Sequence, residues 1–299
     1  MTPHRPAVLV VLVSLALFAE PAYAQPPRPF QLAEVGVAHY FAAPAQERAA
    51  DGDATVALTL LSAGARLPVP VRPDTTTVVL GASFEATLAN FSGLPDTIDA
   101  GDVRDDLYTI SMDVGLRQRL SDRWWLVVAP QPGISSDLVA LSGDDLLFRG
   151  LARVEWAPSD TLLVGAGVLY GTDFGEPLTL PLLRIEWDIT DSLYLSALVP
   201  QRAALMARIG AGVEAGLAGE ISGNVFNLND SPSGAERVRY SLVTAGPLIR
   251  LRLTPVVWLD VAGGVNMVRR FESDIVVQDF EVLEFGEAPF IRAAIAVRS

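Results

Sequence analysis

The stretch DLYTISMDVGLRQRLSDRWWLVVAPQPGI, residues 106–134, decides the fold of this chain. In its first half apolar and polar residues alternate strictly, and the apolar set is Tyr108, Ile110, Met112, Val114, Leu116 and Leu120. A period of two is that of a β-strand, whose successive side chains point to opposite faces. Ser121, Asp122 and Arg123 then predict a tight turn into a second strand. The stretch therefore predicts an antiparallel hairpin with one apolar face and one polar face.

Residues 1–24 are predicted to be a cleaved secretory signal peptide. Arg5 supplies a positive start, an apolar run of about 13 residues follows, and Ala22-Tyr23-Ala24 is a small-x-small cleavage site. The run is shorter than the roughly 20 residues of a membrane-spanning helix, so an uncleaved anchor is the less favoured alternative. We expect residues 25–299 to form a single exported domain.

The composition excludes several classes of function. The sequence has no cysteine, which rules out disulfides and thiolate metal sites or nucleophiles. All 22 basic residues are arginine and the formal net charge is −13, which argues against nucleic acid as a partner because nucleic acids bind to basic patches. No phosphate-binding loop is credible, since the glycine-rich segments do not join a strand to a helix. We expect no cofactor and no metal ion.

Alternation and turn residues divide the rest of the chain into strands. The predicted strands are Gln31–Phe41, Thr55–Arg66, Thr75–Asn90, the two strands of residues 106–134, Leu146–Trp156, Thr161–Gly171, Leu180–Ile189, Ser192–Val199, two strands within Ala203–Asn227, Arg237–Leu253, Val256–Val268 and Pro289–Val297. This gives about 14 strands, if Gly210–Gly212 is a turn. If these glycines form a bulge and the first strand is peripheral, the count is about 12.

Alternating strands behind a signal peptide predict an all-β fold: a transmembrane antiparallel up-and-down β-barrel in the bacterial outer membrane. The apolar face would contact lipid and the polar face a lumen. In lipid every backbone N–H and C=O must be paired, and closure of the sheet achieves this. The connections support the prediction, because short turns near Ser121, Pro158, Thr190 and Thr254 alternate with longer loops. Short periplasmic turns and long external loops are typical of such barrels.

All five tryptophans lie close to these short turns. Indole rings are enriched at membrane interfaces, where the ring is buried and its N–H stays hydrated. We therefore predict a membrane-interface girdle on the periplasmic side, made of Trp124, Trp125, Trp156, Trp187 and Trp258. Aromatic residues near the other strand ends would form an outer girdle of Tyr40, Phe41, Phe91, Phe148, Tyr170, Tyr240, Phe271 and Phe290.

Charged residues inside the predicted strands share the parity of the polar face. On the lipid side an arginine at mid-plane would cost about 2–4 kcal/mol, so these residues are predicted to point into the lumen. The candidate lumen-lining residues are Asp113, Arg117, Arg119, Arg149, Arg153, Glu155, Arg184, Glu186, Arg208, Glu220, Arg250, Arg252 and Asp260. Two interpretations stay open: opposite charges brace a narrow barrel, or they line a water-filled pore and set its ion preference.

Two predicted external loops are acidic. One contains Asp96, Asp99, Asp102 and Asp105, and the other, Phe271–Glu287, has no basic residue. Such carboxylates can hold divalent cations, including those that bridge lipopolysaccharide, although a solvated loop is the simpler interpretation. The expected partners are outer-membrane lipids and lipopolysaccharide, periplasmic chaperones and the barrel-assembly machinery.

The chain is expected to be a passive channel or a structural barrel, and not an enzyme. His39 is the single histidine after the predicted signal peptide, and no G-x-S-x-G motif exists. One alternative is an outer-membrane lipid-modifying enzyme that uses His39 as its base. The other is a soluble periplasmic lipid-binding barrel.

Three segments carry a resemblance to known proteins. They are RIEWDITDSLYLSALVPQRAAL (184–205), GLAGEISGNVFNL (216–228) and RLRLTPVVWLDVAGGVNMVRRFE (250–272). These segments resemble outer-membrane β-barrel proteins of a bacterial family of unknown function. The resemblance implies a barrel fold and an outer-membrane location over nearly the whole exported chain, and it implies no site residues.

Overall fold

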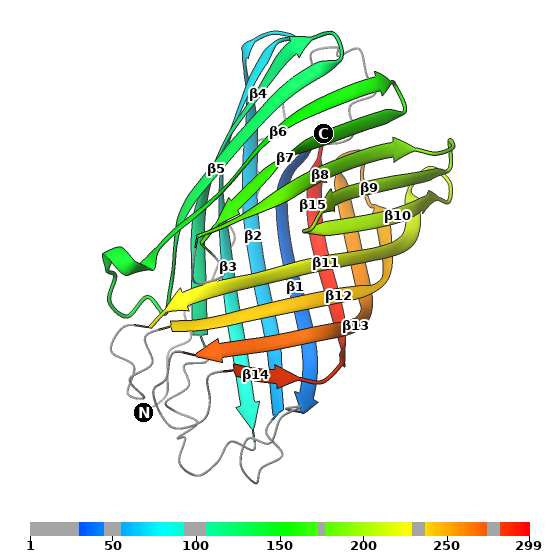
Figure 1. The fold of residues 1–299 in the computed structure, drawn as a ribbon. Coiled ribbons are helices and arrows are strands. Elements are labelled where there is room, and N and C mark those ends of the chain that lie inside the picture. Colours follow the sequence, from blue (N-terminus) through cyan, green and yellow to red (C-terminus); the bar gives the residue numbers. More distant parts are fainter. Residues whose placement is uncertain (1–29, 45–54, 93–105, 173–176, 229–236, 274–281) are drawn as a thin grey trace.

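The structure, a computed structural model, describes residues 30–44, 55–92, 106–172, 177–228, 237–273 and 282–299. These residues form one closed β-barrel (Figure 1). The predicted signal peptide, residues 1–24, lies outside the described residues. In the part of the chain that is described, no helix has the length and apolar character needed to cross a membrane.

Fifteen strand segments build the wall, with one 3-10 turn, η1 (Gly143–Asp145), between β5 and β6. They are β1 (Gln31–Pro44), β2 (Thr55–Arg72), β3 (Thr76–Ser92), β4 (Asp106–Ser121), β5 (Trp124–Ser136), β6 (Leu146–Ser159), β7 (Leu162–Gly171), β8 (Leu178–Asp188), β9 (Leu193–Val199), β10 (Arg202–Arg208), β11 (Val213–Asn227), β12 (Arg237–Arg252), β13 (Val257–Ser273), β14 (Val282–Phe285) and β15 (Ala288–Arg298).

Consecutive strands from β1 to β14 pair antiparallel, including β12 with β13, and β1 pairs with β15, which closes the barrel. β14 and β15 pair with successive parts of β13 and so share one position in the wall. The 14-strand prediction is confirmed. The 12-strand alternative is wrong, because Gly210–Gly212 forms the turn between β10 and β11. Gly210 has a φ of +96°, in the region that favours glycine.

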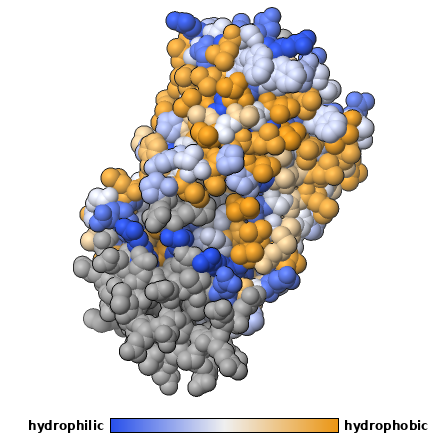
Figure 2. Space-filling view, viewed as in Figure 1, coloured by the Kyte–Doolittle hydropathy of each residue, from blue (hydrophilic) through white to orange (hydrophobic). Residues whose placement is uncertain are grey.

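The two faces of the wall differ as the alternation predicts. In β4, Met112 is 60% exposed, whereas the neighbouring Ser111 is 3% exposed. Apolar residues cover much of the outer surface in Figure 2. The inner face carries both charged side chains and a cluster of buried apolar ones. The predicted apolar outer face is therefore confirmed, whereas the inner face, predicted to be polar, is polar only in part.

The barrel wall has its shortest full hairpin at β9 and β10. These strands have seven residues each and are joined through Pro200 and Gln201. The β8–β9 ladder runs from Leu183, and the β10–β11 ladder ends at Glu220, so β8 and β11 extend beyond the hairpin (Figure 1). At its far end β11 reaches the opposite strand β5, where Asn227 pairs with Ser136. The lumen therefore narrows at the end of the barrel that carries the longer connections.

The predicted acidic loop Phe271–Glu287 is too long. β13 continues to Ser273, and β14, which the alternation did not predict, pairs with it from Arg269 to Glu272. The physical reason is that backbone pairing along β13 continues beyond the predicted strand end at Val268. The remainder of this loop, residues 274–281, and the acidic residues 96–105 lie outside the described residues.

The outer face allows a test of how deeply the residues of β4 lie in the bilayer. Met112→Arg places a charge in the middle of the apolar face and is expected to destabilise the barrel by about 2–4 kcal/mol in a bilayer. Leu120→Arg, on the same face of β4 but beside the turn, is expected to cost about 0–1 kcal/mol. Urea unfolding of the protein in lipid vesicles measures both. Equal costs for the two variants would contradict a bilayer centred on Met112.

Candidate functional site: the barrel lumen

Glu155 is the centre of the ionic network in the half of the lumen near the short turns. Its carboxylate is 2.7 Å from Nε of Arg153, 3.4 Å from Nη1 of Arg184 and 3.8 Å from Nε of Arg117. The Glu155 side chain is only 3% exposed. Three guanidinium groups thus surround one buried carboxylate, and they come from β4, β6 and β8.

The strand between β6 and β8 makes this network possible. Gly165 of β7 lies between Glu155 and Arg184 in the ladder. A Cβ at this position would lie 3.3 Å from Cγ of Glu155 and 3.4 Å from Cβ of Arg184. Because glycine has no side chain, the two charged groups meet across an intervening strand. This supports the sequence-based interpretation that glycines relieve crowding on the inner face.

A second network joins β9, β11, β12, β13 and β15. Asp260 accepts from Arg298 at 2.5 Å and lies 3.5 Å from Nε of Arg250. Arg250 also donates to the Tyr194 hydroxyl at 3.0 Å, and this hydroxyl donates to Glu214 at 2.6 Å. Charges of both signs alternate around the wall, which favours bracing over the segregated charge of an ion-selective pore.

The tryptophans divide between the two faces. Trp124, Trp156 and Trp187 are exposed on the outer face, and Trp124 stacks on Trp156 with ring centroids 5.9 Å apart. For these three the girdle stays a prediction. For Trp125 and Trp258 it is wrong, because they share the inner face with charged residues.

Arginines hold the two inner indoles in place. Arg117 lies over Trp125, with 5.2 Å between the guanidinium carbon and the ring centroid. Arg252 and Arg298 lie over Trp258 at 5.8 and 5.5 Å. Cation–π attraction thus stabilises an indole beside lumen charges, a position that nearness to a turn does not reveal.

An aromatic cluster fills the other half of the lumen. Its rings come from β1, β11, β12, β13, β14 and β15 and are those of Tyr40, Phe226, Tyr240, Phe271, Phe285 and Phe290. Phe226 stacks on Tyr240 at 6.0 Å, and Tyr40 stacks on Phe290 at 5.8 Å. The outer-girdle prediction is therefore wrong for Tyr40, Tyr240, Phe271 and Phe290. Phe41 and Phe148 are exposed on the outside, and the side chain of Phe91 lies outside the described residues.

Several side chains cross the lumen. Asn224 of β11 donates to Thr109 of β4 and accepts from Arg149 of β6 at 2.8 Å. The Tyr240 hydroxyl of β12 donates to Glu85 of β3 at 3.0 Å. These contacts tie opposite walls together across the lumen.

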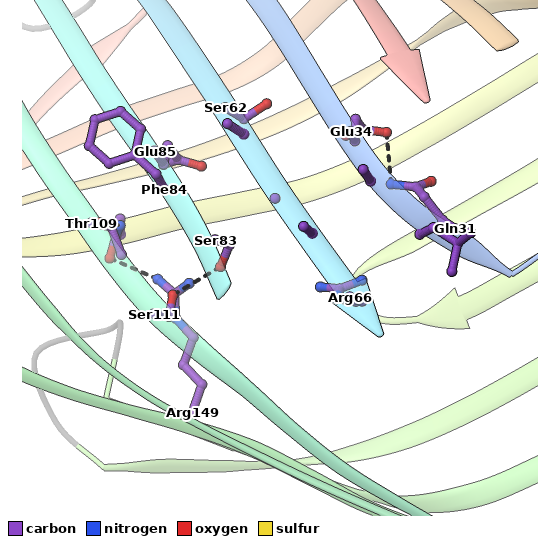
Figure 3. A pocket seen from close by; sticks show the side chains of 16 residues that line it. Gln31, Glu34, Ser62, Arg66, Ser83, Phe84, Glu85, Thr109, Ser111 and Arg149 are labelled. Carbon is purple, nitrogen blue, oxygen red and sulfur yellow. Dashed lines mark hydrogen bonds between the residues drawn. The ribbon is translucent and has the colours of Figure 1, made fainter. Parts of the chain in front are cut away.

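A polar cavity of about 160 Å³ remains beside these crossing contacts. Figure 3 shows Glu34, Ser62 and Arg66 from β1 and β2, with Thr109, Ser111 and Arg149 from β4 and β6 across from them. Arg66 also donates to Asp113 at 3.0 Å. The cavity has room for a few water molecules or a small polar group.

The structure brings all thirteen predicted lumen-lining residues to the inner face through the strand register. Their role as the lining of an open pore stays a prediction. Within the described ranges, no three His, Asp or Glu side chains are grouped to hold a metal ion. His39 lies on the outer face, where Nδ1 is 2.9 Å from Oγ1 of Thr59 and the ring contacts Phe41 edge-on.

Arg269 is an inner residue that the alternation missed. It is 1% exposed and donates through Nη1 to the backbone oxygens of Phe41 (3.0 Å) and Val56 (2.7 Å). A bulge causes the error: the register shifts at Met267, so the inward parity changes from Asn266 to Arg269. The adjacent pair Arg269-Arg270 was the available signal, because one residue of such a pair faces inward in any regularly alternating strand.

The Glu155 network yields a matched pair of variants. Glu155→Gln leaves three guanidinium groups around a neutral side chain and is expected to cost about 3 kcal/mol, the scale for breaking a buried pair. Glu220→Gln removes the 2.6 Å contact with Arg292, where both side chains are over one-third exposed, and is expected to cost about 0–1 kcal/mol. Unfolding in urea measures both costs. A smaller cost for Glu155→Gln than for Glu220→Gln would refute its central role.

Several solved structures are similar to this barrel. The chain is similar in structure to a deltaS2 mutant of the TodX monoaromatic hydrocarbon channel, with 9% identity, a TM-score of 0.49 and coverage of 91% of this chain and 90% of that one. It is also similar to an outer membrane channel from Pseudomonas putida F1, with 11% identity, a TM-score of 0.46 and coverage of 94% and 100%. A FadL homologue from Pseudomonas aeruginosa gives 12% identity, a TM-score of 0.41 and coverage of 90% and 89%.

None of the curated proteins matches the chain. A family model described as a domain of unknown function (DUF6268) matches residues 21–294, nearly the whole length. The match includes the strands that carry the ionic networks and the aromatic cluster. The chain belongs to the DUF6268 family.

Proposed function

We propose that this protein is an outer-membrane channel for small solutes of low charge, whose lumen is closed to hydrated ions in the conformation described. The observation that carries the proposal is the aromatic cluster across one half of the lumen. An apolar constriction disfavours a hydrated ion, because the ion would lose water without gaining polar partners. A small apolar or aromatic solute meets no such penalty.

The outer surface supports a location in the outer membrane. Large apolar side chains are exposed on strands all around the wall, among them Met112, Leu217 and Ile295. In water such a surface would promote aggregation, whereas in a bilayer it is the expected lipid contact. Outer-membrane lipids and lipopolysaccharide, with the periplasmic chaperones and the assembly machinery, remain the proposed partners.

The two alternatives have less support. A soluble periplasmic barrel would not favour an exposed apolar surface of this extent. A lipid-modifying enzyme would need His39 beside a nucleophile. The Thr59 hydroxyl is the one that His39 contacts, on the outer face, and within the described residues no third side chain hydrogen-bonds the ring to orient it as a catalytic base. The proposed role of the ionic networks around Glu155 and Asp260 is to brace the lumen.

Planar-bilayer recording of the refolded protein tests closure to ions. The wild type is expected to give no discrete conductance steps. Phe226→Ala/Tyr240→Ala removes one stacked pair from the cluster and is expected to produce them. The control is Leu217→Ala, which shortens a side chain on the outer face of β11. Heat-modifiable gel mobility verifies folding of each variant, and large steps in the wild type would overturn closure.

Uptake of N-phenyl-1-naphthylamine tests the solute class. This apolar aromatic dye fluoresces in lipid and crosses an outer membrane slowly. Bacterial cells that express the wild type are expected to take it up faster than cells with an empty vector. An equal rate in both would overturn the proposed channel function.

A further inference from the structure

Prolines in the wall occupy two kinds of position. Proline has no N–H, so it is tolerated where a strand has no neighbour to receive that hydrogen bond. Pro68 and Pro70 of β2 lie beyond the β1–β2 ladder, which extends only to Ala65. Pro181 of β8 lies beyond the β8–β9 ladder, which begins at Leu183. These three prolines remove no bond from a ladder.

Pro130 and Pro132 of β5 are placed differently. The β5–β6 ladder is continuous through both residues, so their nitrogens face β4. The β4–β5 ladder breaks there: it pairs Ser111 with Gly133, resumes only at Leu116 with Val128, and keeps the same register. Two successive donors toward β4 are therefore missing from the middle of the wall.

A shorter break occurs at Pro247, between β12 and β13. There the facing strand carries Gly263 and Gly264, and a Cβ on Gly246 would lie 2.7 Å from Cα of Gly264. The two backbones are thus in close contact at that point. We call the longer interruption, residues 112–115 of β4 against residues 129–132 of β5, the β4–β5 seam.

On the lumen side, one pair of side chains bridges the seam. Nε2 of Gln131 donates to Oδ1 of Asp113 at 2.8 Å, and Arg66 holds the other oxygen of Asp113. On the outer side, Met112 and Val114 are exposed apolar side chains. The seam is therefore joined by a polar contact inside and bordered by apolar residues outside.

The polar cavity borders one end of the seam. Ser111, at the end of the paired part of β4, lines it, as does Arg149, which is opposite Gln131 in the ladder. Asn224 also lines the cavity, and it is paired in the ladder with Tyr240 of the aromatic cluster. The cavity thus lies between the aromatic cluster and one end of the seam, and neighbours of both line it.

Passage along the lumen toward the short turns is unfavourable for an apolar solute. Toward the short turns the lumen is lined by the networks around Glu155 and Asp260. A solute that displaced these contacts would leave buried charges without partners, at a cost of several kcal/mol per ion. The bilayer beyond the seam carries no such cost.

From these observations we infer that the β4–β5 seam is a lateral exit, through which small apolar solutes pass from the lumen into the hydrocarbon layer. The inference rests on the proposed channel function and specifies its route. Opening requires the Gln131–Asp113 contact to separate while the flanking ladders stay paired.

A reversible lock across the seam is the direct test. The sequence contains no cysteine, so Asp113→Cys/Gln131→Cys introduces one pair that faces across the seam. These residues are opposite each other in the flanking register, a spacing that suits a disulfide. The control is Thr55→Cys/Ser92→Cys, a pair at the end of the intact β2–β3 ladder whose hydroxyl oxygens are 2.6 Å apart and which does not line the cavity.

The readout is uptake of N-phenyl-1-naphthylamine by cells that express each variant. The oxidised seam lock is expected to lower uptake to the empty-vector rate, and reductant is expected to restore it. The oxidised control lock is expected to match the wild type. Uptake that stays at the wild-type rate with the seam lock oxidised would overturn the lateral exit while leaving the channel function intact. A wild type that never exceeds the empty vector would overturn both.

Restoring the missing donors is a second, independent test. Pro130→Ala/Pro132→Ala supplies two N–H groups toward β4 and is expected to slow both dye uptake and backbone hydrogen exchange at residues 112–115. Pro181→Ala, whose new N–H faces no paired strand, is expected to change neither. Unchanged exchange at residues 112–115 in a folded double variant would show that the seam is already closed, and would overturn the inference.

Discussion

The pairing of backbone N–H and C=O groups is the constraint on which the rest of this structure depends. In hydrocarbon an unpaired peptide group costs several kcal/mol, so the sheet must close on itself. β12 closes on β13, and β1 on β15, without any parallel strand in the main circuit. Every other property of the lumen follows from the inward parity that this closure imposes on each strand.

Closure also forces charged groups of several strands into a small volume. The lumen accommodates them by combining small and large residues. Gly165 has no side chain, so Glu155 and Arg184 can meet across its strand. The Tyr194 hydroxyl donates to Glu214 and accepts from Arg250. Arginine suits this role because its planar group makes several bonds in fixed directions. The result is a lumen braced by ion pairs in the half near the short turns and filled by aromatic rings in the other half.

The strands, their number and the inward direction of the predicted charges could be derived from the sequence, because a period of two survives in one chain without knowledge of its neighbours. Bulges could not be derived this way. One extra residue near Met267 reversed the parity for Arg269 and Phe271, and another between Tyr40 and Ala43 brought Ala43 to the inner side although it has the parity of the exposed Phe41. The positions of Trp125 and Trp258 depended on arginines from other parts of the chain, which alternation does not reveal.

The pairing of Asn227 with Ser136 gives the barrel two circumferences. At the end with the longer connections, β11 meets β5 and completes a shorter circuit that omits β6 to β10. Those strands form a side lobe that is attached along its two margins, to β5 and to β11 (Figure 1). The lobe is sequence-contiguous, so its hairpins form from local contacts, whereas the shorter circuit needs partners from both halves of the chain. Strands β6 to β10 can thus pair through contacts that are local in sequence, whereas the shorter circuit can close only after the last strand, β15, has been synthesised.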